Sequence, residues 1–384
     1  MSNKGQAVNK ERLITSFYKE VVLPATRRQC EQTHNSVLWT LEKLQQSEFI
    51  LDFLKKRFSL EDNRLEVGFL GIELRNRFLL AAGMDKDARV LPALACFGMG
   101  GIEAGSFTLQ PREDNPLVGE EILPGGRVMK VKRMQRFPDG TVINWMGFPG
   151  VGTAKAVENL NKNREKVGIP VGVNLAVSPG LVEDEEKKKD LRHSLELVYP
   201  AKPEWLTLNV SCPNVMETAR NKKMKEAEML IAFFAETSKE LERQFGFRIP
   251  RLIKIGPDME REEIGRIVET AKLFNCDGIV ATNTTIDRTG IREKYAHIQQ
   301  GGLSGPRLFE KSLRTVHEVS VFNHMCGKKL VIIACGGIDN IEKWREMRGY
   351  GADLCQILTG FVFGGPYFFK KMCRDNLNPW YRFA

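Results

Sequence analysis

The stretch that decides the fold is residues 205–215, which read Trp-Leu-Thr-Leu-Asn-Val-Ser-Cys-Pro-Asn-Val. Residues 206–210 are mostly apolar or β-branched, which is typical of a short buried strand. Proline has no N–H to donate to a neighbouring strand, so we expect the strand to end before Pro213. The loop that leaves the strand then carries three polar side chains, Ser211, Cys212 and Asn214. Such residues are also ordinary in turns, and a single cysteine is more often a small buried side chain than a reactive one.

This strand belongs to a repeating series of short apolar runs, polar or glycine-rich turns and helical stretches. We predict strands at 78–82, 100–104, 170–175, 205–210, 251–256, 277–282, 330–334 and 353–358. Helical periodicity follows most of them, as at 226–245, 261–274 and 340–350. Eight such units predict an α/β fold, a (β/α)8 TIM barrel, with its active site at the C-terminal strand ends. Residues 106–149 interrupt the rhythm and predict extra loops or antiparallel strands over the barrel mouth.

The residues before the barrel have a different character. Residues 11–29 and 35–58 show helical periodicity, with apolar stripes beside lysines and arginines. A hairpin-like segment at 65–74 leads into the barrel. We therefore divide the chain into an N-terminal helical extension, residues 1–64, and a barrel domain, residues 65–384. Short amphipathic helices of this kind pack on the protein's own body, bind a partner or lie on a membrane surface.

The composition is that of a globular protein, with 384 residues, 42% hydrophobic and 27% charged. No apolar run reaches the ~20 residues that span a bilayer, and no apolar signal segment follows Met1. We therefore expect an intracellular protein, cytoplasmic or peripheral on a membrane. The eight cysteines form no Cys-x-x-Cys pair and there are only five histidines, so we expect reduced thiols and no metal site. The net charge of +9 suits an anionic cofactor, an anionic membrane surface or nucleic acid, although we expect most of it on solvated faces such as the lysine run 187–189.

Residues able to bind a ligand gather at the predicted C-terminal strand ends. Lys254 ends the fifth strand inside the barrel mouth, where a buried ammonium requires an anion or an electron-rich group. The last two strands end in small-residue turns, whose free backbone N–H groups suit a phosphate. Other strand ends carry amides and hydroxyls, namely Asn174, Asn209, Thr282, Asn283 and Thr284. Their common position predicts a single ligand site.

Seven motifs in order carry a family resemblance. They are Ala81-Ala82-Gly83-x-Asp85-Lys86, Asn144-x-x-Gly147-Phe148, Asn209-x-Ser211-Cys212-Pro213-Asn214, Lys254-Ile255-x-Pro257-Asp258, Thr282-Asn283-Thr284-Thr285, Gly301-Gly302-Leu303-Ser304-Gly305 and Gly336-Gly337-Ile338. With these motifs, residues 65–366 resemble the dihydroorotate dehydrogenases, a family of FMN-dependent barrels. The resemblance implies oxidation of dihydroorotate to orotate, with hydride transfer to FMN, in de novo pyrimidine biosynthesis.

The resemblance also implies roles by position. FMN would be held by Ala81, Ala82, Gly83, Ser106, Asn174, Asn209, Lys254, Thr282, Ser304, Gly305, Gly336, Gly337, Thr359 and Gly360. The pyrimidine would be held by Lys86, Asn144, Gly147, Phe148, Asn209, Asn214, Asn283 and Thr284. Cys212 would be the catalytic base, Lys86 would pair with the substrate carboxylate, and Lys254 would stabilise negative charge on the reduced flavin. Amide side chains both donate and accept, which suits a ring of alternating N–H and C=O groups.

The electron acceptor is less clearly indicated, because the chain combines features of two branches of the family. The quinone-linked branch has an N-terminal helical pair that residues 1–75 resemble, including His34. This feature predicts a quinone as acceptor and a peripheral membrane contact through residues 1–60. That branch, however, uses serine as its base, and Cys212 is typical of the soluble branch, for which fumarate or NAD is the alternative acceptor. Other positions also depart from the family pattern, namely Pro149, Ala176-Val177-Ser178, Met216-Glu217-Thr218 and Leu358.

Two other functions fit part of the pattern. A dihydrouridine synthase-like enzyme is also a basic FMN barrel and would use the positive charge to bind RNA. Such enzymes carry a helical RNA-binding domain after the barrel, which we do not expect after Pro366, so we predict no nucleic-acid partner. The second alternative is a barrel that binds FMN or a pyrimidine without turnover. Cys212, Lys86 and the four asparagines of the implied site argue against it.

Overall fold

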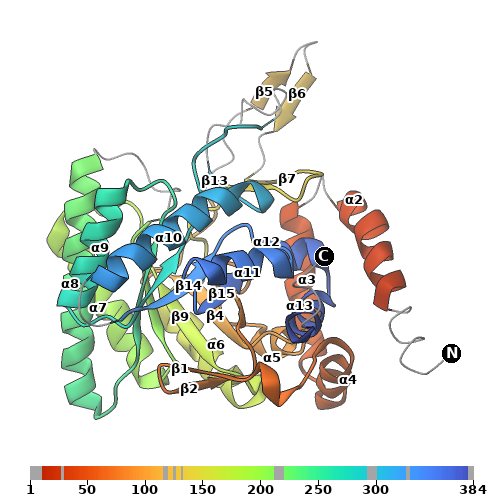
Figure 1. Ribbon diagram of the computed structural model, residues 1–384, viewed down its shortest axis with the longest axis horizontal. Helices are drawn as coiled ribbons and strands as arrows, with labels where there is room; N and C mark the ends of the chain where they lie inside the picture. Colours follow the sequence, from red (N-terminus) through yellow and green to blue (C-terminus); the bar gives the residue numbers. More distant parts are fainter. Residues whose placement is uncertain are drawn as a thin grey trace.

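The computed structural model describes residues 11–26, 30–115, 120–123, 127–130, 133–211, 220–291, 301–325 and 329–378, and its centre is a closed parallel barrel (Figure 1). Around the barrel, the strands are β3 (Phe78–Leu80), β4 (Gly101–Phe107), β9 (Val171–Leu175), β10 (Leu206–Asn209), β11 (Arg251–Ile255), β12 (Gly278–Ala281), β14 (Val331–Cys335) and β15 (Leu354–Ile357). They follow one another in chain order, and β15 pairs with β3 to close the ring. The predicted (β/α)8 barrel is confirmed.

The strands form where the sequence is continuously apolar, because a parallel barrel strand is covered on both faces. Every residue of β9 and β11 is buried. Polar residues inside these strands are therefore unusual, and each needs a hydrogen-bond partner. The register places Asn209 opposite Lys254 and Thr207 opposite Asn174, which brings polar groups from neighbouring strands to the same levels of the barrel.

Helices pack around the outside of the barrel. They are α5 (Leu91–Ala95), α6 (Thr153–Val167), α7 (Asp184–Val198), α8 (Arg220–Phe245), α9 (Arg261–Leu273), α10 (Phe309–Met325), α11 (Ile341–Gly349), α12 (Thr359–Gly364) and α13 (Phe368–Leu377). Local chemistry sets their ends. At the start of α9, for example, the Glu260 side chain and the Glu263 side chain form a capping box. Helix α8 begins six residues before the predicted start at 226.

The N-terminal helices differ in part from the prediction. Residues 11–17, a π-helical turn at Tyr18–Val22 and α2 (Leu23–Thr26) form the first helical stretch. The predicted single span 35–58 is wrong, because it divides into α3 (Cys30–Leu44) and α4 (Glu48–Phe58). Ser47 causes the break by accepting a hydrogen bond from the backbone N–H of Ile50 at 3.4 Å, which caps α4.

The N-terminal helices pack on the barrel. Leu38 and Leu41 of α3 and Leu51 of α4 belong to the same apolar cluster as the barrel core. A short 3-10 helix, Asn63–Leu65, leads to the antiparallel pair β1 (Val67–Phe69) and β2 (Ile72–Leu74), which confirms the predicted hairpin. The division of the chain at residue 64 stays a prediction.

Additional strands lie beyond the barrel mouth. β7 (Met134–Arg136), β8 (Val142–Asn144) and β13 (Gly302–Ser304) form a three-stranded antiparallel sheet. The antiparallel pair β5 (Glu120–Leu123) and β6 (Arg127–Lys130) projects from the barrel, at the top of Figure 1. The expectation of antiparallel strands within 106–149 is therefore confirmed.

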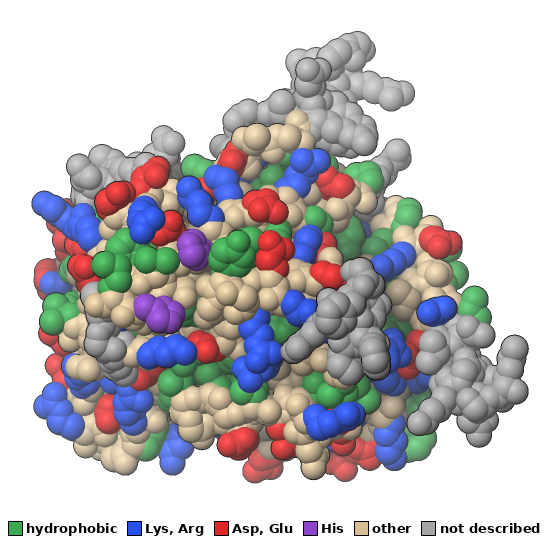
Figure 2. Space-filling view, viewed as in Figure 1, with side chains coloured by type: hydrophobic (Ala, Val, Ile, Leu, Met, Phe, Trp, Pro, Cys, Tyr) green, Lys and Arg blue, Asp and Glu red, His purple; other side chains and the backbone are tan. Residues whose placement is uncertain are grey.

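The surface carries charges of both signs. On the face shown in Figure 2, acidic and basic side chains are interspersed. The lysine run 187–189 is only partly solvated, however. Lys187 is buried and forms an ion pair with Glu226 of α8 at 2.8 Å, so the expectation that all three lysines are exposed is wrong. Within the described segments, no helix combines the length and the apolar character that crossing a membrane requires.

Candidate active site

A cavity of about 820 Å³ lies at the C-terminal ends of the barrel strands. Its walls include the strand ends, the antiparallel sheet β7–β8–β13 and the N-terminal helices. Ligand cavities are commonly ~300–1,000 Å³, so this one can hold a cofactor or a substrate of ordinary size. It is the place where a TIM barrel carries its active site.

The structure brings most of the predicted site residues to this cavity. Those that line it are Ala81, Ala82, Gly83, Lys86, Ser106, Asn144, Gly147, Phe148, Asn209, Lys254, Thr282, Asn283, Thr284, Ser304, Gly305, Gly336, Gly337, Thr359 and Gly360. Asn174 does not line the cavity and is fully buried beneath Ser106, to which it is hydrogen-bonded. Cys212 and Asn214 lie outside the described residues.

Two asparagines from neighbouring strand ends meet on the cavity wall. Asn283 Nδ2 donates to Asn209 Oδ1 and to the Ser211 carbonyl, both at 3.2 Å. Asn209 Oδ1 also accepts from the Ser211 backbone N–H at 3.3 Å, and Asn283 Oδ1 accepts from the Thr284 backbone N–H at 2.8 Å. Backbone groups have fixed roles as donors or acceptors, so they hold both amides in one orientation.

Lys254 supplies a buried positive charge to the cavity. Lys254 is 5% exposed, and it forms no ion pair with a carboxylate of the described residues. A buried ammonium without a counter-ion is unfavourable, so this position favours an anionic or electron-rich ligand. Cys335, at the end of β14, lies close enough to Lys254 for an electrostatic interaction. Burial raises the pKa of the Cys335 thiol, and the positive charge of Lys254 opposes that shift.

Lys86 is a second cation of the cavity, on the side of the N-terminal helices. Burial lowers its pKa, while the charges of Asp114, Asp87 and Glu31 oppose the shift. His34 of α3 lines the same region. Burial, aided by the charges of Lys86 and Arg89, lowers the pKa of His34 to about 4, so its imidazole is neutral at physiological pH.

Hydrogen bonds from Arg112 and Asn115 fix the loop that carries Gly147. Arg112 Nε donates to the Gly147 carbonyl at 2.6 Å, and the Asn115 backbone N–H donates to the Met146 carbonyl at 2.9 Å. Gly147 has φ +78°, and a Cβ there would lie 2.2 Å from Asn115 Oδ1, so only glycine fits.

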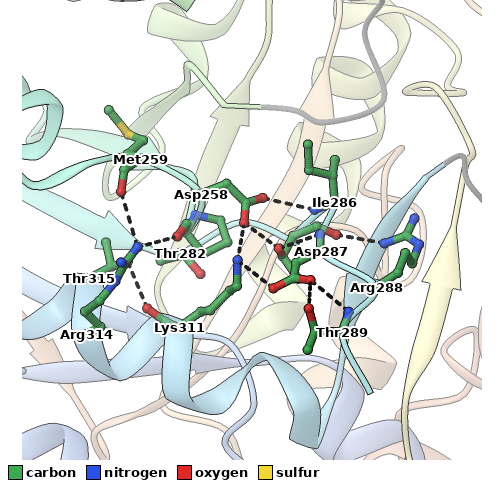
Figure 3. A network of polar contacts seen from close by, with 12 residues as sticks. Asp258, Met259, Thr282, Ile286, Asp287, Arg288, Thr289, Lys311, Arg314 and Thr315 are labelled. Atoms are coloured by element: carbon green, nitrogen blue, oxygen red, sulfur yellow. Dashed lines mark hydrogen bonds and ion pairs between the residues drawn. The ribbon is translucent and has the colours of Figure 1, made fainter. Parts of the chain in front are cut away.

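The segment after Thr284 is fixed by a cluster of charged groups, drawn in Figure 3. Asp258 Oδ1 accepts from Thr285 Oγ1 at 2.6 Å and from Lys311 Nζ at 2.9 Å. Lys311 also forms an ion pair with Asp287 at 3.0 Å. This cluster connects the β11 end, the β12 loop and α10, and so it positions the backbone next to Asn283 and Thr284.

The turn after β14 brings backbone close to the cavity. Gly336 and Gly337 have φ values of +119° and +75°. A Cβ at Gly336 would lie 2.2 Å from Ser312 Oγ, and one at Gly337 would lie 2.5 Å from the Phe309 backbone. The two glycines therefore allow a close approach of chain segments that no other residue permits.

The structure places at or near the site several residues that the sequence analysis did not predict. Glu103 stands in the middle of β4 and is 1% exposed, and Gln356 of β15 lines the cavity. Arg136, also on the wall, is buried against Thr26 and Cys30, with hydrogen-bond distances of 2.7 and 3.3 Å. An acid within an apolar strand is a signal that could have found Glu103, because a central strand has no exposed face.

Comparison with known proteins places the chain in a family. The family model described as dihydroorotate dehydrogenase matches residues 64–378. The chain belongs to the dihydroorotate dehydrogenase family. The match begins where the N-terminal helices end, and it includes every strand of the barrel. This finding supports the resemblance seen in the motifs and does not support the dihydrouridine synthase-like alternative.

Individual family members cover most of the chain. A dihydroorotate dehydrogenase (quinone) from Pseudoalteromonas translucida is 32% identical over 307 residues, 80% of this chain and 85% of that protein. One from Bartonella tribocorum is 32% identical over 305 residues, 79% of each chain. Among solved structures, a DHODH from Eimeria tenella in complex with ferulenol has a TM-score of 0.76 and 25% identity, and covers 92% of both chains.

Proposed function

We propose that this protein oxidises dihydroorotate to orotate in pyrimidine biosynthesis, with FMN as its bound cofactor and a quinone as the electron acceptor. The observation that carries this proposal is the position of Lys254, a buried cation without a carboxylate partner among the described residues, on the wall of a barrel-mouth cavity in a member of this family. The names of the relatives, dihydroorotate dehydrogenase (quinone), support both the substrate and the acceptor.

The residues present fit FMN. Lys254 offers a positive charge for the electron-rich end of the flavin, and the amides and hydroxyls around it offer donors and acceptors to the ring. The glycine turn after β14, with Thr359 and Gly360 after β15, offers backbone N–H groups for a phosphate. When bound, FMN accepts the hydride that leaves the dihydropyrimidine ring.

The chain's own residues would bind and orient the substrate. Lys86 would pair with the substrate carboxylate, and Asn144, Asn209 and Asn283 would bind the ring amides. Gly147, Phe148 and Thr284 would close the pocket around the ring. Asn214 and the base Cys212 belong to the same motif, and Cys212 would remove the proton from the carbon next to the ring carbonyl while the hydride leaves from the neighbouring carbon.

The acceptor would reach the cavity from the side of the N-terminal helices. Val37, Leu41 and Leu23 of these helices line the cavity together with His34 and Tyr18. Apolar side chains of the same helices are exposed at the surface, including Leu13, Phe17, Trp39, Phe49 and Phe53. An apolar cavity wall beside exposed apolar side chains suits a quinone that enters from a membrane, so residues 1–60 would make the peripheral membrane contact.

The proposal can be tested on the purified protein. We expect a yellow protein with one FMN per chain, whose flavin is bleached by dihydroorotate and recovers its colour fastest with a quinone. Fumarate and NAD are the matched alternative acceptors, assayed on the same reduced sample. A folded, colourless protein that does not bind added FMN would exclude the cofactor, and faster reoxidation by fumarate or NAD would exclude the quinone.

A further inference from the structure

The carboxylate of Glu103 is buried at the centre of the barrel and is surrounded by hydrogen-bond donors. Oε2 accepts from Trp205 Nε1 at 3.1 Å, from Thr207 Oγ1 at 2.7 Å and from Gln356 Nε2 at 2.8 Å. Oε1 accepts from Asn174 Nδ2 at 2.9 Å. The two oxygens therefore have different environments, three donors on one and the Asn174 amide on the other.

A chain of hydrogen bonds leads from Glu103 to the cavity wall. Because a carboxylate only accepts, Asn174 must turn its NH2 group toward Glu103 and its Oδ1 toward Ser106. The Ser106 hydroxyl accordingly donates to Asn174 Oδ1. Its oxygen accepts from Asn209 Nδ2 at 3.4 Å, and Asn209 Oδ1 faces Asn283. Glu103 thus fixes the direction of these hydrogen bonds as far as Ser106, and the Ser211 backbone N–H fixes the Asn209 amide independently.

We propose that Glu103 is a positioning residue that sets the donor and acceptor pattern of Ser106 on the cavity wall. It does so by committing the Ser106 proton to Asn174, which leaves Ser106 as an acceptor. Glu103 itself does not line the cavity. This inference rests on the proposed function, since the ligand that meets this pattern is the flavin with its pyrimidine substrate.

The same contacts predict the effect of a neutral amide at this position. The three donors around Oε2 keep a carbonyl oxygen there, so Glu103→Gln turns its new NH2 group toward Asn174. Asn174 then rotates its amide and turns its own NH2 toward Ser106. The Ser106 hydroxyl now accepts from both asparagines, and its proton points away from Asn174. The cavity wall gains a donor where it had an acceptor.

The test exchanges the carboxylate and the amide between positions 103 and 174. In the double variant Glu103→Gln/Asn174→Asp, the new carboxylate accepts from the new amide and from Ser106, so the original direction returns and the net charge is unchanged. We measure release of FMN from diluted holoprotein by flavin fluorescence. We expect about tenfold weaker binding for Glu103→Gln, in the range that an unmatched buried polar group costs, and recovery to within about threefold in the double variant.

Three further variants distinguish a change in hydrogen-bond direction from an effect on folding or on charge. Thr207→Val removes one donor to Oε2 without changing the direction of the chain, so it should lower the unfolding temperature but keep FMN affinity. If Glu103→Gln alone does not fold, Asn174→Asp serves instead, since adding Glu103→Gln to it should restore FMN binding. In a Ser106→Ala background, Glu103→Gln should have no further effect, because the hydroxyl that transmits the direction is absent.

Several outcomes overturn the inference. They are wild-type FMN affinity in folded Glu103→Gln, no recovery in the double variant, and an equal effect of Glu103→Gln with and without the Ser106 hydroxyl, which would show a charge effect. Failure of the wild-type protein to bind FMN at all would instead overturn the proposed function. Steady-state assays add a second readout, because a change of the donor pattern should also raise KM for dihydroorotate.

Discussion

Glu31 of α3 accepts a hydrogen bond from Arg133 Nε at 3.0 Å, and this pair connects the N-terminal helices to the loop that carries Gly147. Arg133 Nη1 donates to the Asn115 carbonyl at 3.2 Å, and the Arg133 carbonyl accepts from the Trp145 backbone N–H at 2.6 Å. The N-terminal helices and the loop that carries Gly147 therefore share one support. Movement of α3 would therefore shift the loop that carries Gly147.

We predict that Glu31→Gln raises KM for dihydroorotate about three- to tenfold and changes kcat little. The ion pair is only partly buried, so its loss should cost ~1 kcal/mol. The effect should appear on the substrate although the residue stands on an N-terminal helix. The matched control is Glu158→Gln, which breaks an exposed pair with Lys155 on α6, and it should leave KM unchanged. An equal KM for Glu31→Gln and wild type would show that the helix and the loop are independent.

Lys254 gives a second prediction. Lys254→Met keeps the length of the side chain and removes the charge, so we expect FMN affinity to fall about ten- to hundredfold, because a hydrogen bond to a charged group contributes ~1.5–3 kcal/mol. The protein should become slightly more stable without cofactor, since an unpaired buried charge is lost. Lys187→Met is the control, a buried lysine paired with Glu226, and it should lower stability without affecting FMN. Unchanged FMN binding in Lys254→Met would exclude the proposed role.

The barrel was predictable because each strand is a short apolar run bounded by glycine, proline or polar residues. That signal is local, and eight successive β–α units are the number that closes a TIM barrel. The break between α3 and α4 was missed because Gln45 and Gln46 are compatible with a helix. Ser47 followed by Glu48 was the available sign of a new helix start.

The residues that support the site were much less predictable than the residues that line it. Lys254, Asn209 and Asn283 stand at strand ends, where a TIM barrel places its active site, so position alone indicated them. Glu103 was missed because its role depends on donors from β9, β10 and β15, up to 253 residues away in the chain. The contact between Glu31 and Arg133 depends on how a helix outside the barrel packs on an inserted loop, which no local pattern encodes.

His34 makes stability depend on pH. Its pKa is about 4 in the folded protein and near 6.5 in an unfolded chain, so between these values only the unfolded state binds the proton. The free energy of unfolding should therefore be unaffected above pH 6.5 and should fall as the pH is lowered toward 4. His34→Gln should be less sensitive to pH over this interval, as measured by urea unfolding. In NMR spectra, a His34 signal that titrates near pH 6.5 would contradict the prediction.

The proposed base is Cys212. Cys212 lies outside the described residues, so its role rests on the motif that begins at Asn209. An unperturbed thiol has a pKa of ~8.5, and the thiolate is the form that removes a proton, so flavin reduction by dihydroorotate should accelerate as the pH rises through the apparent pKa of the thiol. Cys212→Ser should keep FMN but reduce it slowly near neutral pH, because the pKa of an alcohol is far higher.

Cys212→Ala should be slower still, by roughly 10²–10⁴-fold, which is the usual effect of removing a positioned base. The measurement is stopped-flow bleaching of the flavin across pH for the wild type and both variants. Since neither substitution changes the charges that hold the flavin, FMN content should be equal in all three, and differences in rate then report proton removal. Cys335→Ala is the control, a cavity thiol outside the motif, and it should retain the pH dependence of the wild type. Wild-type rates in Cys212→Ala would show that another group removes the proton.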